Sequence, residues 1–583
     1  MLKIPYGLSN FERIRTKNFL YVDKTHFIEK IEAMDYIVHL RPRRFGKSLF
    51  LSMIDRYYDV ESADKFDELF KGLYIYDNPT DYKSSYYILR FNFSGIENTE
   101  IGDLRKGFLD SVEDGIISFI DRYKLDIQVE ESNHSAAMLR SLLRQFKKLD
   151  LPHKIYILID EYDHFTNSLL SGDATEFLSV LTRGGFVRSF YEVIKERADS
   201  GIVERIFITG VMSVTLDSMT SGFNIASNIT IRKGFSDMMG FTAEEVQELL
   251  RLSFSNPENQ EEVVQLTTEE QRQIYDVFRE NYNGYLFSGR SKSKVFNSTL
   301  IIYYLQHYMP DRLSPESLEV ANLNQSGATI DSIARLKNHE QNYKVIEEII
   351  SEGQIDGELK PFIEIDKKFD TNDLITLLFN IGMLTIKGFD MVTQFEMPNK
   401  IIKNVYLQYL GDLIQRQSNY TLDTKQQQNA IIEVERKGDI TALTALVSEF
   451  LMSTSGRNAI KFDEKYIKLI YMFLLSSTNQ FSVYDEFPAL QGFNDLFIQK
   501  ASNSTARYEV LIELKYIKKG DTTEAKIEEE VAEGISQIEK YMKDERLAKR
   551  DNLREFVVVF SGFEPVRLLE FKNSGVIDCA DSR

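Results

Sequence analysis

The sequence predicts an α/β protein that begins with a doubly wound parallel sheet, and three observations predict this fold. Short apolar runs, each suited to one buried strand, stand at 36–40, 155–159 and 205–208, and a β-rich run stands at 86–93. Helical periodicity fills the intervening segments, most clearly 101–149. Polar residues follow the apolar runs, and sheets of this type bind ligands at the carboxyl ends of their strands.

Composition indicates an ordinary globular protein. Of the 583 residues, 43% are hydrophobic and 27% are charged, and this length suits about three domains. A single cysteine, Cys579, excludes a disulfide within one chain and fits a reducing cytoplasm. We see no signal-peptide pattern and no apolar run of about 18 residues, so we expect a cytoplasmic protein without a membrane partner. The net charge of −19 argues against a basic coat for nucleic acid but is compatible with a local basic cleft.

The segment 41–48 reads RPRRFGKS and lies between the first apolar run and an apolar helix. This layout is typical of a phosphate-binding loop, whose backbone N–H groups point at phosphate. Lys47 is expected to reach the β- and γ-phosphates of ATP, and Ser48 to hold Mg²⁺. Arg41 stands where such loops usually have their first glycine, so a helix-capping Ser after a glycine turn is the alternative. The loop residues expected to bind the nucleotide are Arg43, Arg44, Phe45, Gly46, Lys47, Ser48 and Leu49.

Two adjacent carboxylates, Asp160 and Glu161, directly follow the apolar run 155–159. Beside a phosphate loop, Asp160 is expected to orient the Mg²⁺ shell, and Glu161 to position or deprotonate the attacking water. The alternative is a strand that merely ends in solvated acids. Thr209 follows the 205–208 run and is either a sensor of the γ-phosphate or a turn residue. Because parallel strands end at one edge, Lys47, Asp160 and Thr209 are expected to meet there.

The chain from about residue 236 to 445 is predicted to be mainly helical. Thr242 and Glu245 have the spacing of a capping box at a helix start. A short β-like piece stands at 382–386. We find no convincing catalytic constellation in this region.

A second group of polar residues lies near the C-terminus. Asp495 lies in the strand-like run 493–498, and Glu513 and Lys515 lie in the next one, 508–515. Alternation in a strand places Glu513 and Lys515 on one face, opposite three apolar side chains. Two carboxylates can hold Mg²⁺, and a lysine can orient or help deprotonate water for attack on a phosphodiester. A solvated face or a cross-strand ion pair is the alternative.

Helices are predicted on both sides of this pair of strands. Glu464 starts the helix 463–475, and Gln537 and Tyr541 share one side of the helix that contains 527–541. The basic stretch 540–554 could contact phosphates, although a solvated helix is the simpler interpretation.

These motifs together resemble two known protein families. RPRRFGKS, the runs 21–25 and 159–163, and the stretch 209–211 with 221–224 resemble the bacterial AAA-ATPase-like family, which is similar to the archaeal-type, signal-transducing P-loop ATPases. That family commonly carries arginines in its loop and lacks the first glycine. The Asp495 to Lys515 segment resembles the PD-(D/E)XK nuclease superfamily. There the resemblance implies that Glu464 on the preceding helix adds a metal ligand and that Gln537 aids the site.

The resemblance implies three domains: an AAA-ATPase-like P-loop domain at 1–235, a helical lid with a winged-helix-like connector at 236–445, and a restriction-endonuclease-like α/β domain at 446–583. The leading hypothesis is an ATP-hydrolysing protein that regulates a Mg²⁺-dependent nuclease acting on DNA or RNA. Its catalytic residues are Glu161, Asp495, Glu513, Lys515 and Gln537, and its metal ligands are Ser48, Asp160, Glu464, Asp495 and Glu513.

Two alternatives remain open at this stage. One is a signalling ATPase whose nuclease-fold domain is inactive and binds nucleic acid or a protein. The other is an interaction protein that binds ATP without hydrolysing it. A homo-oligomer is compatible with either.

Overall fold

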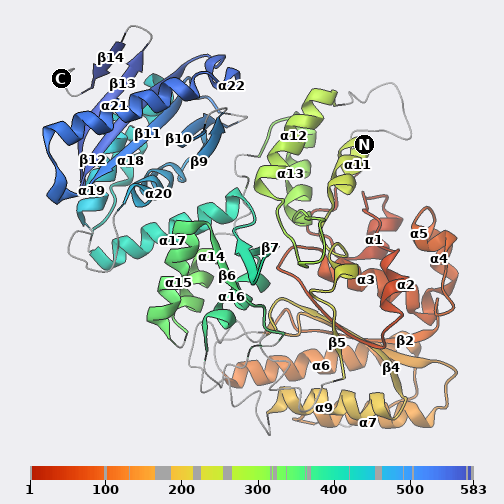
Figure 1. Cartoon of the computed structure of the whole chain (residues 1–583). Coiled ribbons are helices and arrows are strands. Elements are labelled where there is room, and N and C mark those ends of the chain that lie inside the picture. Colours follow the sequence, from red (N-terminus) through yellow and green to blue (C-terminus); the bar gives the residue numbers. More distant parts are fainter. Residues whose placement is uncertain are drawn as a thin grey trace. The chain divides into compact units, whose positions relative to one another are not determined.

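The structure is a computed structural model. It describes residues 3–96, 101–129, 132–164, 185–213, 225–253, 266–315, 318, 325–336, 338–361, 363, 369–418, 420–453, 463–489, 492–501, 504–572 and 575–579. The stretch 221–224, used above for the resemblance, lies outside these residues. The chain divides into two compact units, Met1–Ile402 and Lys403–Arg583 (Figure 1).

A five-stranded parallel sheet forms the centre of the first unit. Its order is β2-β3-β4-β1-β5, so β4 lies between β1 and β3. Four of these strands are the predicted ones, and nearly every residue of β3 and β4 is buried. The strand bounds are Tyr36–Leu40 (β1), Tyr86–Asn92 (β2), Lys154–Asp160 (β3), Val203–Gly210 (β4) and Ser227–Asn228 (β5).

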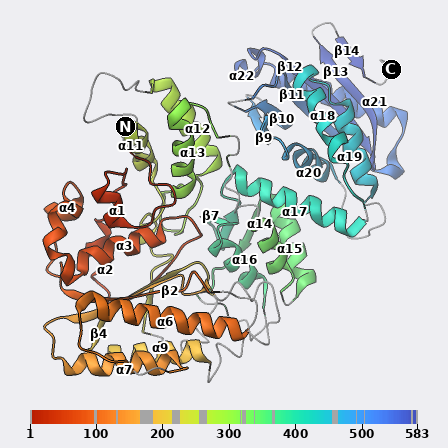
Figure 2. The ribbon, with the colours of Figure 1, turned by 180° about the vertical axis from the view of Figure 1, so that it is seen from behind.

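Helices cover both faces of this sheet, which confirms the doubly wound α/β prediction. The helix α3 contacts β2 and β3, whereas α6 contacts β2 and α9 contacts β4. Figures 1 and 2 show α6, α7 and α9 on the opposite side of the sheet from α1 to α4. The bounds are Phe11–Thr16 (α1), Phe27–Ile31 (α2), Lys47–Tyr58 (α3), Phe66–Phe70 (α4), Tyr74–Asp77 (α5), Ile101–Tyr123 (α6), Ser135–Lys148 (α7) and Phe186–Asp199 (α9).

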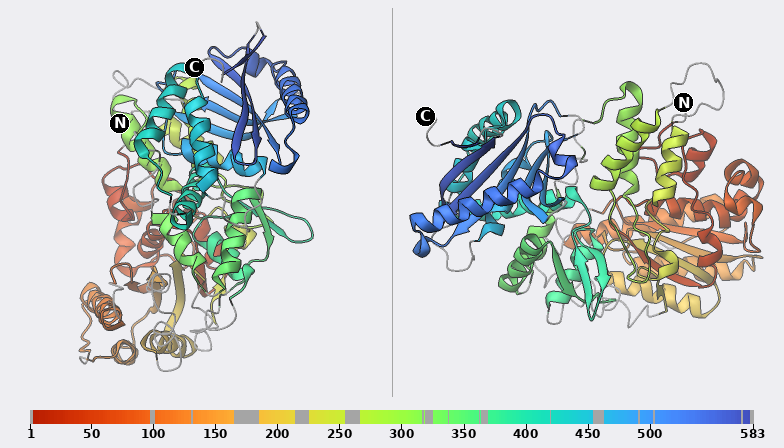
Figure 3. Two further views of the ribbon diagram at one scale, coloured as in Figure 1. Left: turned by 90° about the vertical axis from the view of Figure 1, so that its left-hand side faces the viewer. Right: turned by 45° about the horizontal axis from the view of Figure 1, so that its top comes forward.

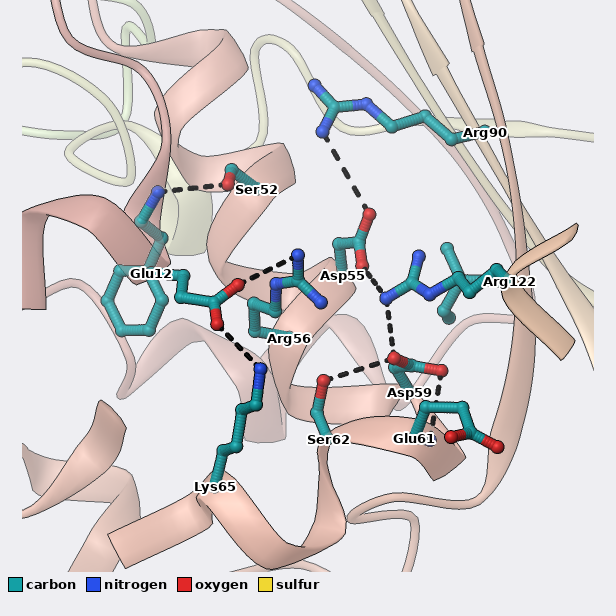
Figure 4. Close-up of polar contacts among 12 residues, drawn as sticks. Glu12, Ser52, Asp55, Arg56, Asp59, Glu61, Ser62, Lys65, Arg90 and Arg122 are labelled. Atoms are coloured by element: carbon teal, nitrogen blue, oxygen red, sulfur yellow. Dashed lines mark hydrogen bonds and ion pairs between the residues drawn. The ribbon is translucent and has the colours of Figure 1, made fainter. Parts of the chain in front are cut away.

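Ion pairs hold α3, the helix that follows the loop, in place (Figure 4). Arg122 of α6 lies 2.8 Å from Asp55 and 2.5 Å from Asp59. Arg90 of β2 lies 3.9 Å from Asp55 and also 3.9 Å from Asp160. Since Asp55 and Asp59 are buried, removing Arg122 would leave two carboxylates without their main counter-ion.

The rest of the first unit is mainly helical, as predicted. Thr242 and Glu245 form the predicted capping box, each side chain accepting the other's backbone N–H. The β-like piece at 382–386 overlaps only the start of β7, because Gly382 has φ +82° and turns the chain. The helices are Ala243–Ser253 (α11), Thr268–Asn281 (α12), Ser298–Asp311 (α13), Gln325–Ala334 (α14), His339–Glu352 (α15) and Thr371–Asn380 (α16). A three-stranded antiparallel sheet comprises Gln354–Gly357 (β6), Thr393–Glu396 (β8) and Thr385–Phe389 (β7).

A mixed six-stranded sheet forms the centre of the second unit. Its order is β14-β13-β12-β11-β10-β9, with β11 and β12 parallel and the other neighbours antiparallel. The predicted strands with Asp495 and Glu513 are β10 and β11. The bounds are Phe481–Ala489 (β9), Gly492–Lys500 (β10), Glu509–Ile517 (β11), Leu553–Ser561 (β12), Glu564–Lys572 (β13) and Gly575–Asp578 (β14).

The helix α21 covers one face of this mixed sheet with an apolar stripe that includes Ile527 and Ile538. Figure 3 shows the sheet between α21 and the helices α18 and α19. The helices of this part are Lys400–Ser418 (α17), Thr424–Lys437 (α18), Thr441–Ser453 (α19), Glu464–Leu475 (α20), Glu524–Tyr541 (α21) and Glu545–Ala548 (α22). Among the described residues, no helix combines the length and the apolar character needed to cross a membrane.

Gly210, at the end of β4, provides a test of this packing. A Cβ atom there would lie 2.2 Å from Asp163 Oδ1 and 2.5 Å from the Tyr162 ring. We therefore expect Gly210→Ala to lower the free energy of unfolding by about 2 kcal/mol, because the turn after β3 must move. Thermal unfolding followed by calorimetry measures the loss. Gly234→Ala is the matched control, since none of the described residues beyond its chain neighbours has an atom within 4 Å of its added Cβ. Equal midpoints for the two variants would contradict the close packing.

Candidate functional site

The loop after β1 has the conformation of a tight turn that leads into α3. Gly46 precedes the helix with φ +88°, a region that favours glycine, and Arg44 has φ +72°. The Lys47 ammonium donates to the carbonyls of Arg41 (3.1 Å) and Pro42 (3.0 Å). Burial lowers the pKa of Lys47, although the carboxylates of Glu161 and nearby acids oppose this shift. The loop thus holds a buried cation at the end of the sheet.

Arg41, which stands where such loops usually have their first glycine, is bound by later parts of the chain. Its guanidinium donates to the carbonyls of Leu40, Thr230 and Phe235, each at 2.8 Å, and stacks 4.1 Å from the Phe287 ring centre. The side chain is buried, and this burial lowers its pKa to about 9, so it stays protonated at neutral pH. Arg41 therefore anchors the start of the loop to later parts of the chain.

The middle region of the chain contacts the loop from outside. The Arg44 carbonyl accepts hydrogen bonds from the backbone N–H (3.2 Å) and hydroxyl (2.8 Å) of Thr299. The Phe45 carbonyl accepts one from the Gly240 N–H (3.0 Å). The Phe45 ring packs edge-on against Tyr285. A change in loop conformation would therefore change these contacts.

The acidic residues at the end of β3 have different environments. Asp160 is 1% exposed, and within the described part of the chain its Oδ1 has no hydrogen-bond partner. Burial raises the pKa of Asp160, opposed by the Ser48 hydroxyl and by Arg90. Glu161 has φ +49°, which is uncommon for a non-glycine residue. Its carboxylate lies 3.3 Å from His164 Nδ1, and this contact lowers the pKa of Glu161.

Thr209 and Asp163 occupy the neighbouring strand end. The Thr209 hydroxyl is buried and donates to the His39 carbonyl of β1 at 3.0 Å, so it joins two strands. Its role as a phosphate sensor stays a prediction. Asp163, which the sequence reasoning missed, accepts the backbone N–H groups of Val211 (3.0 Å) and Met212 (2.6 Å). Its signal was present in the sequence, because Asp163 is the next acid after Glu161.

A cavity of about 1000 Å³ lies over the loop within the first unit. All seven predicted loop residues line it, and so do Glu161 and Asp163. Asp160 and Thr209 are not part of the lining; Asp160 reaches the site through Ser48. The remaining walls come from the N-terminal segment, including Leu8 and Tyr21, and from the middle region, including Asn297. This volume is at the upper end of small-molecule pockets.

The mixed sheet of the second unit brings the other predicted residues together. Asp495 Oδ2 accepts the backbone N–H of Leu514 at 2.9 Å, so this carboxylate lies beside the Glu513 position of the next strand. Asp495 Oδ1 accepts from the ammonium of Lys468 at 2.5 Å. Lys468 also lies 3.2 Å from Glu464, one turn earlier on α20. Sequence reasoning missed Lys468, whose only signal is its spacing of four from Glu464.

Glu513 and Lys515 form a buried pair at 3.1 Å. Burial and the nearby Asp495 raise the pKa of Glu513 to about 8. Within the described residues, Glu513 Oε2 and Gln537 Oε1 are buried without hydrogen-bond partners. Burial, and next the Glu513 carboxylate, raise the pKa of Tyr541.

The basic stretch 540–554 contains cations that are already paired. Arg546 lies 2.7 Å from Asp544, Arg550 lies 2.7 Å from Glu509, and Arg554 lies 2.5 Å from Glu570. These pairs favour the interpretation of the stretch as a solvated, ion-paired surface.

The donor sets of both sites fit Mg²⁺, which prefers carboxylate and hydroxyl oxygens. In each site one buried carboxylate oxygen, Asp160 Oδ1 or Glu513 Oε2, has no hydrogen-bond partner among the residues that the structure describes. A bound cation would supply a partner. Across the described ranges, no group of three or more His, Cys, Asp or Glu side chains has the arrangement of a metal site.

The first unit has the parallel sheet and phosphate-type loop of an ATPase-like domain. The second unit has a mixed sheet with Asp and Glu-x-Lys on neighbouring strands, as in a nuclease-like domain. Comparison with known families agrees. Residues 5–220 match the model described as a predicted AAA-ATPase, and residues 462–570 match that of the PD-(D/E)XK nuclease superfamily. The chain therefore carries an AAA-ATPase-like domain and a PD-(D/E)XK nuclease superfamily domain, which confirms the resemblance seen in its motifs.

One curated relative is an uncharacterized protein in the vnfD 5'region of Azotobacter chroococcum mcd 1. It is 26% identical over 310 residues, which is 53% of this chain and 53% of the relative. The chain thus matches about half the length of this relative.

The Arg41 anchor leads to a prediction about stability. Arg41→Ala would leave three buried carbonyls without their donor, so we expect the free energy of unfolding to fall by about 3 kcal/mol. Calorimetric unfolding of the full chain measures this loss. Arg43→Ala is the matched control, because Arg43 is exposed in the same loop and should change stability by less than about 0.5 kcal/mol. Equal losses in both variants would show that Arg41 is no anchor.

Proposed function

We propose that this protein binds and hydrolyses ATP and thereby regulates a Mg²⁺-dependent nuclease site in its C-terminal domain. The observation that carries the proposal is the presence of two phosphate-chemistry constellations in one chain. Residues 43–49 line a cavity that also contains Glu161, and Asp495 lies on the strand next to Glu513 and Lys515. The two family matches support the same pair of activities.

In the ATP site, we assign the loop N–H groups and Lys47 to the phosphates, because the Lys47 ammonium donates to two loop carbonyls that phosphate oxygens can replace. Ser48 and Asp160 are assigned to Mg²⁺, which would neutralise the phosphates. Glu161 lines the cavity and is assigned to the attacking water. The apolar wall that includes Leu8 and Tyr21 suits the base of the nucleotide.

In the nuclease site, Asp495, Glu513 and Glu464 are assigned to Mg²⁺, which would activate water and stabilise the charge of the phosphate. Lys515, which pairs with Glu513, is assigned to orient the water. Gln537, whose Oε1 is buried without a hydrogen-bond partner among the described residues, is assigned to aid the site. The substrate class is nucleic acid, DNA or RNA.

Regulation is proposed from the contacts of the loop within the first unit. The carbonyls of Arg44 and Phe45 are bound by Thr299 and Gly240, so a loop that closes on phosphate would shift the lid region 236–445. That region leads in sequence to the nuclease domain at 446–583 and could transmit the nucleotide state. A cytoplasmic location, proposed from the single Cys579, and a homo-oligomer complete the proposal.

A second function is favoured by one observation: the two strand carboxylates of the site, Asp495 and Glu513, already have lysine partners, Lys468 and Lys515. The chain would then be a signalling ATPase whose nuclease-fold domain binds nucleic acid or a protein without cutting. The two functions differ in whether nucleic acid is cleaved at Asp495 and Glu513.

The nuclease assignment predicts the behaviour of two variants. Glu513→Ala and Lys515→Ala should each lower Mg²⁺-dependent cleavage of labelled DNA or RNA by about 100-fold or more, because one loses a ligand and the other the water-orienting amine. Lys526→Ala is the matched control, since Lys526 forms surface ion pairs with Glu529 and Glu530 in the same domain. Cleavage that persists unchanged in both site variants would exclude the assignment, and no cleavage by any form would favour the second function.

The ATPase assignment predicts a separation of binding from hydrolysis. Glu161→Gln should keep ATP binding and lower phosphate release by about 100-fold or more, because the amide cannot accept the proton of water. Lys47→Ala should weaken ATP binding itself. Phosphate release and calorimetric ATP titration measure the two effects. Equal phosphate release by Glu161→Gln and the unchanged protein would contradict the role, and ATP binding without any release would indicate an interaction protein.

A further inference from the structure

Lys468 occupies a place in the nuclease site that the proposed function does not use. Its side chain, 13% exposed, comes from α20 and reaches Asp495 Oδ1 at 2.5 Å and Glu464 at 3.2 Å. Its ammonium therefore contacts two of the three carboxylates assigned to the metal. Because burial opposes its charge but both acids favour it, the pKa of Lys468 is raised and the group is a cation.

The neighbouring contacts leave Asp495 Oδ1 as the oxygen for which cations compete. The other oxygen of Asp495 is bound by the Leu514 N–H at 2.9 Å. Lys515 forms ion pairs with Glu513 at 3.1 Å and with Glu533 at 3.6 Å. Among the described residues, no ion pair joins Lys515 to Asp495. Each strand carboxylate thus has its own lysine.

We propose that, in the metal-free protein, the Lys468 ammonium occupies the position beside Asp495 Oδ1 where a divalent cation binds. The metal therefore binds only when this ammonium moves away. The inference rests on the proposed metal site. An ammonium and a dication on one carboxylate oxygen repel each other, and Mg²⁺ requires its ligands at about 2.1 Å. After displacement, Lys468 turns to solvent or to a phosphate of the substrate, because Glu464 is itself assigned to the metal. Lys468 accordingly sets the metal affinity of the site.

The experiment is a calorimetric titration of the full chain with Mn²⁺, without nucleotide. Lys468→Met keeps the length of the side chain and removes its charge, so it should bind Mn²⁺ at least tenfold more tightly than the unchanged protein. Lys526→Met, which removes a surface ammonium from the same domain, should bind with unchanged affinity. Asp495→Ala should abolish the heat of Mn²⁺ binding at this site, so the heat lost in this variant is the heat that belongs to the site.

The outcomes separate this inference from the proposed function. If the unchanged protein binds Mn²⁺ through Asp495 and Lys468→Met binds it equally or more weakly, the inference is wrong and the metal site stands. If neither form gives heat that depends on Asp495, the metal site itself is wrong, and the inference with it. Binding by Lys468→Met alone supports both.

A measurement on the unchanged protein covers the case in which Lys468→Met does not fold. Reductive methylation followed by mass spectrometry reports how accessible each lysine amine is. Lys468 should be protected in metal-free protein and should react several-fold faster at saturating Mn²⁺, while Lys526 reacts equally in both. Equal reactivity of Lys468 with and without Mn²⁺ would overturn the inference.

Discussion

A buried charge must have a partner, and both candidate sites depend on this constraint. In the first unit, the buried cations Arg41 and Lys47 donate hydrogen bonds to backbone carbonyls. These bonds determine where the loop begins and where the Lys47 ammonium lies. In the second unit, Lys468 and Lys515 neutralise Asp495 and Glu513. Within the described part of the chain, Asp160 Oδ1 and Glu513 Oε2 have no hydrogen-bond partner, so an added cation would have its largest effect there.

The sequence predicted those parts of the structure that depend on periodic patterns of apolar and polar residues. The parallel strands could be found because five or so apolar residues in a row need burial on both faces, and Glu513 and Lys515 because alternation puts them on one side of a strand. The roles of Arg41 and Lys468 could not be found in this way. Arg41 binds backbone carbonyls about 190 positions away. Because every residue has a backbone carbonyl, no sequence pattern marks these partners. Lys468 resembles any solvated helical lysine until the fold brings Asp495 to it.

The two sites suggest a division of work along the chain. The nucleotide cavity has walls from the N-terminal segment, the loop and the middle region, so nucleotide would bind all three at once. In the proposed nuclease site, Asp495 and Glu513 each have a lysine partner, so the proposed metal would have to compete with an existing cation.

The most direct test of this coupling is the rate at which the full chain cleaves labelled nucleic acid with Mg²⁺, measured with ATP, with ADP and without nucleotide, in the unchanged protein and in Lys47→Ala. The account predicts that the rate depends on the nucleotide in the unchanged protein and that Lys47→Ala loses this dependence. A rate that is the same under all three conditions, and the same in Lys47→Ala, would contradict the proposed regulation of the nuclease site by ATP.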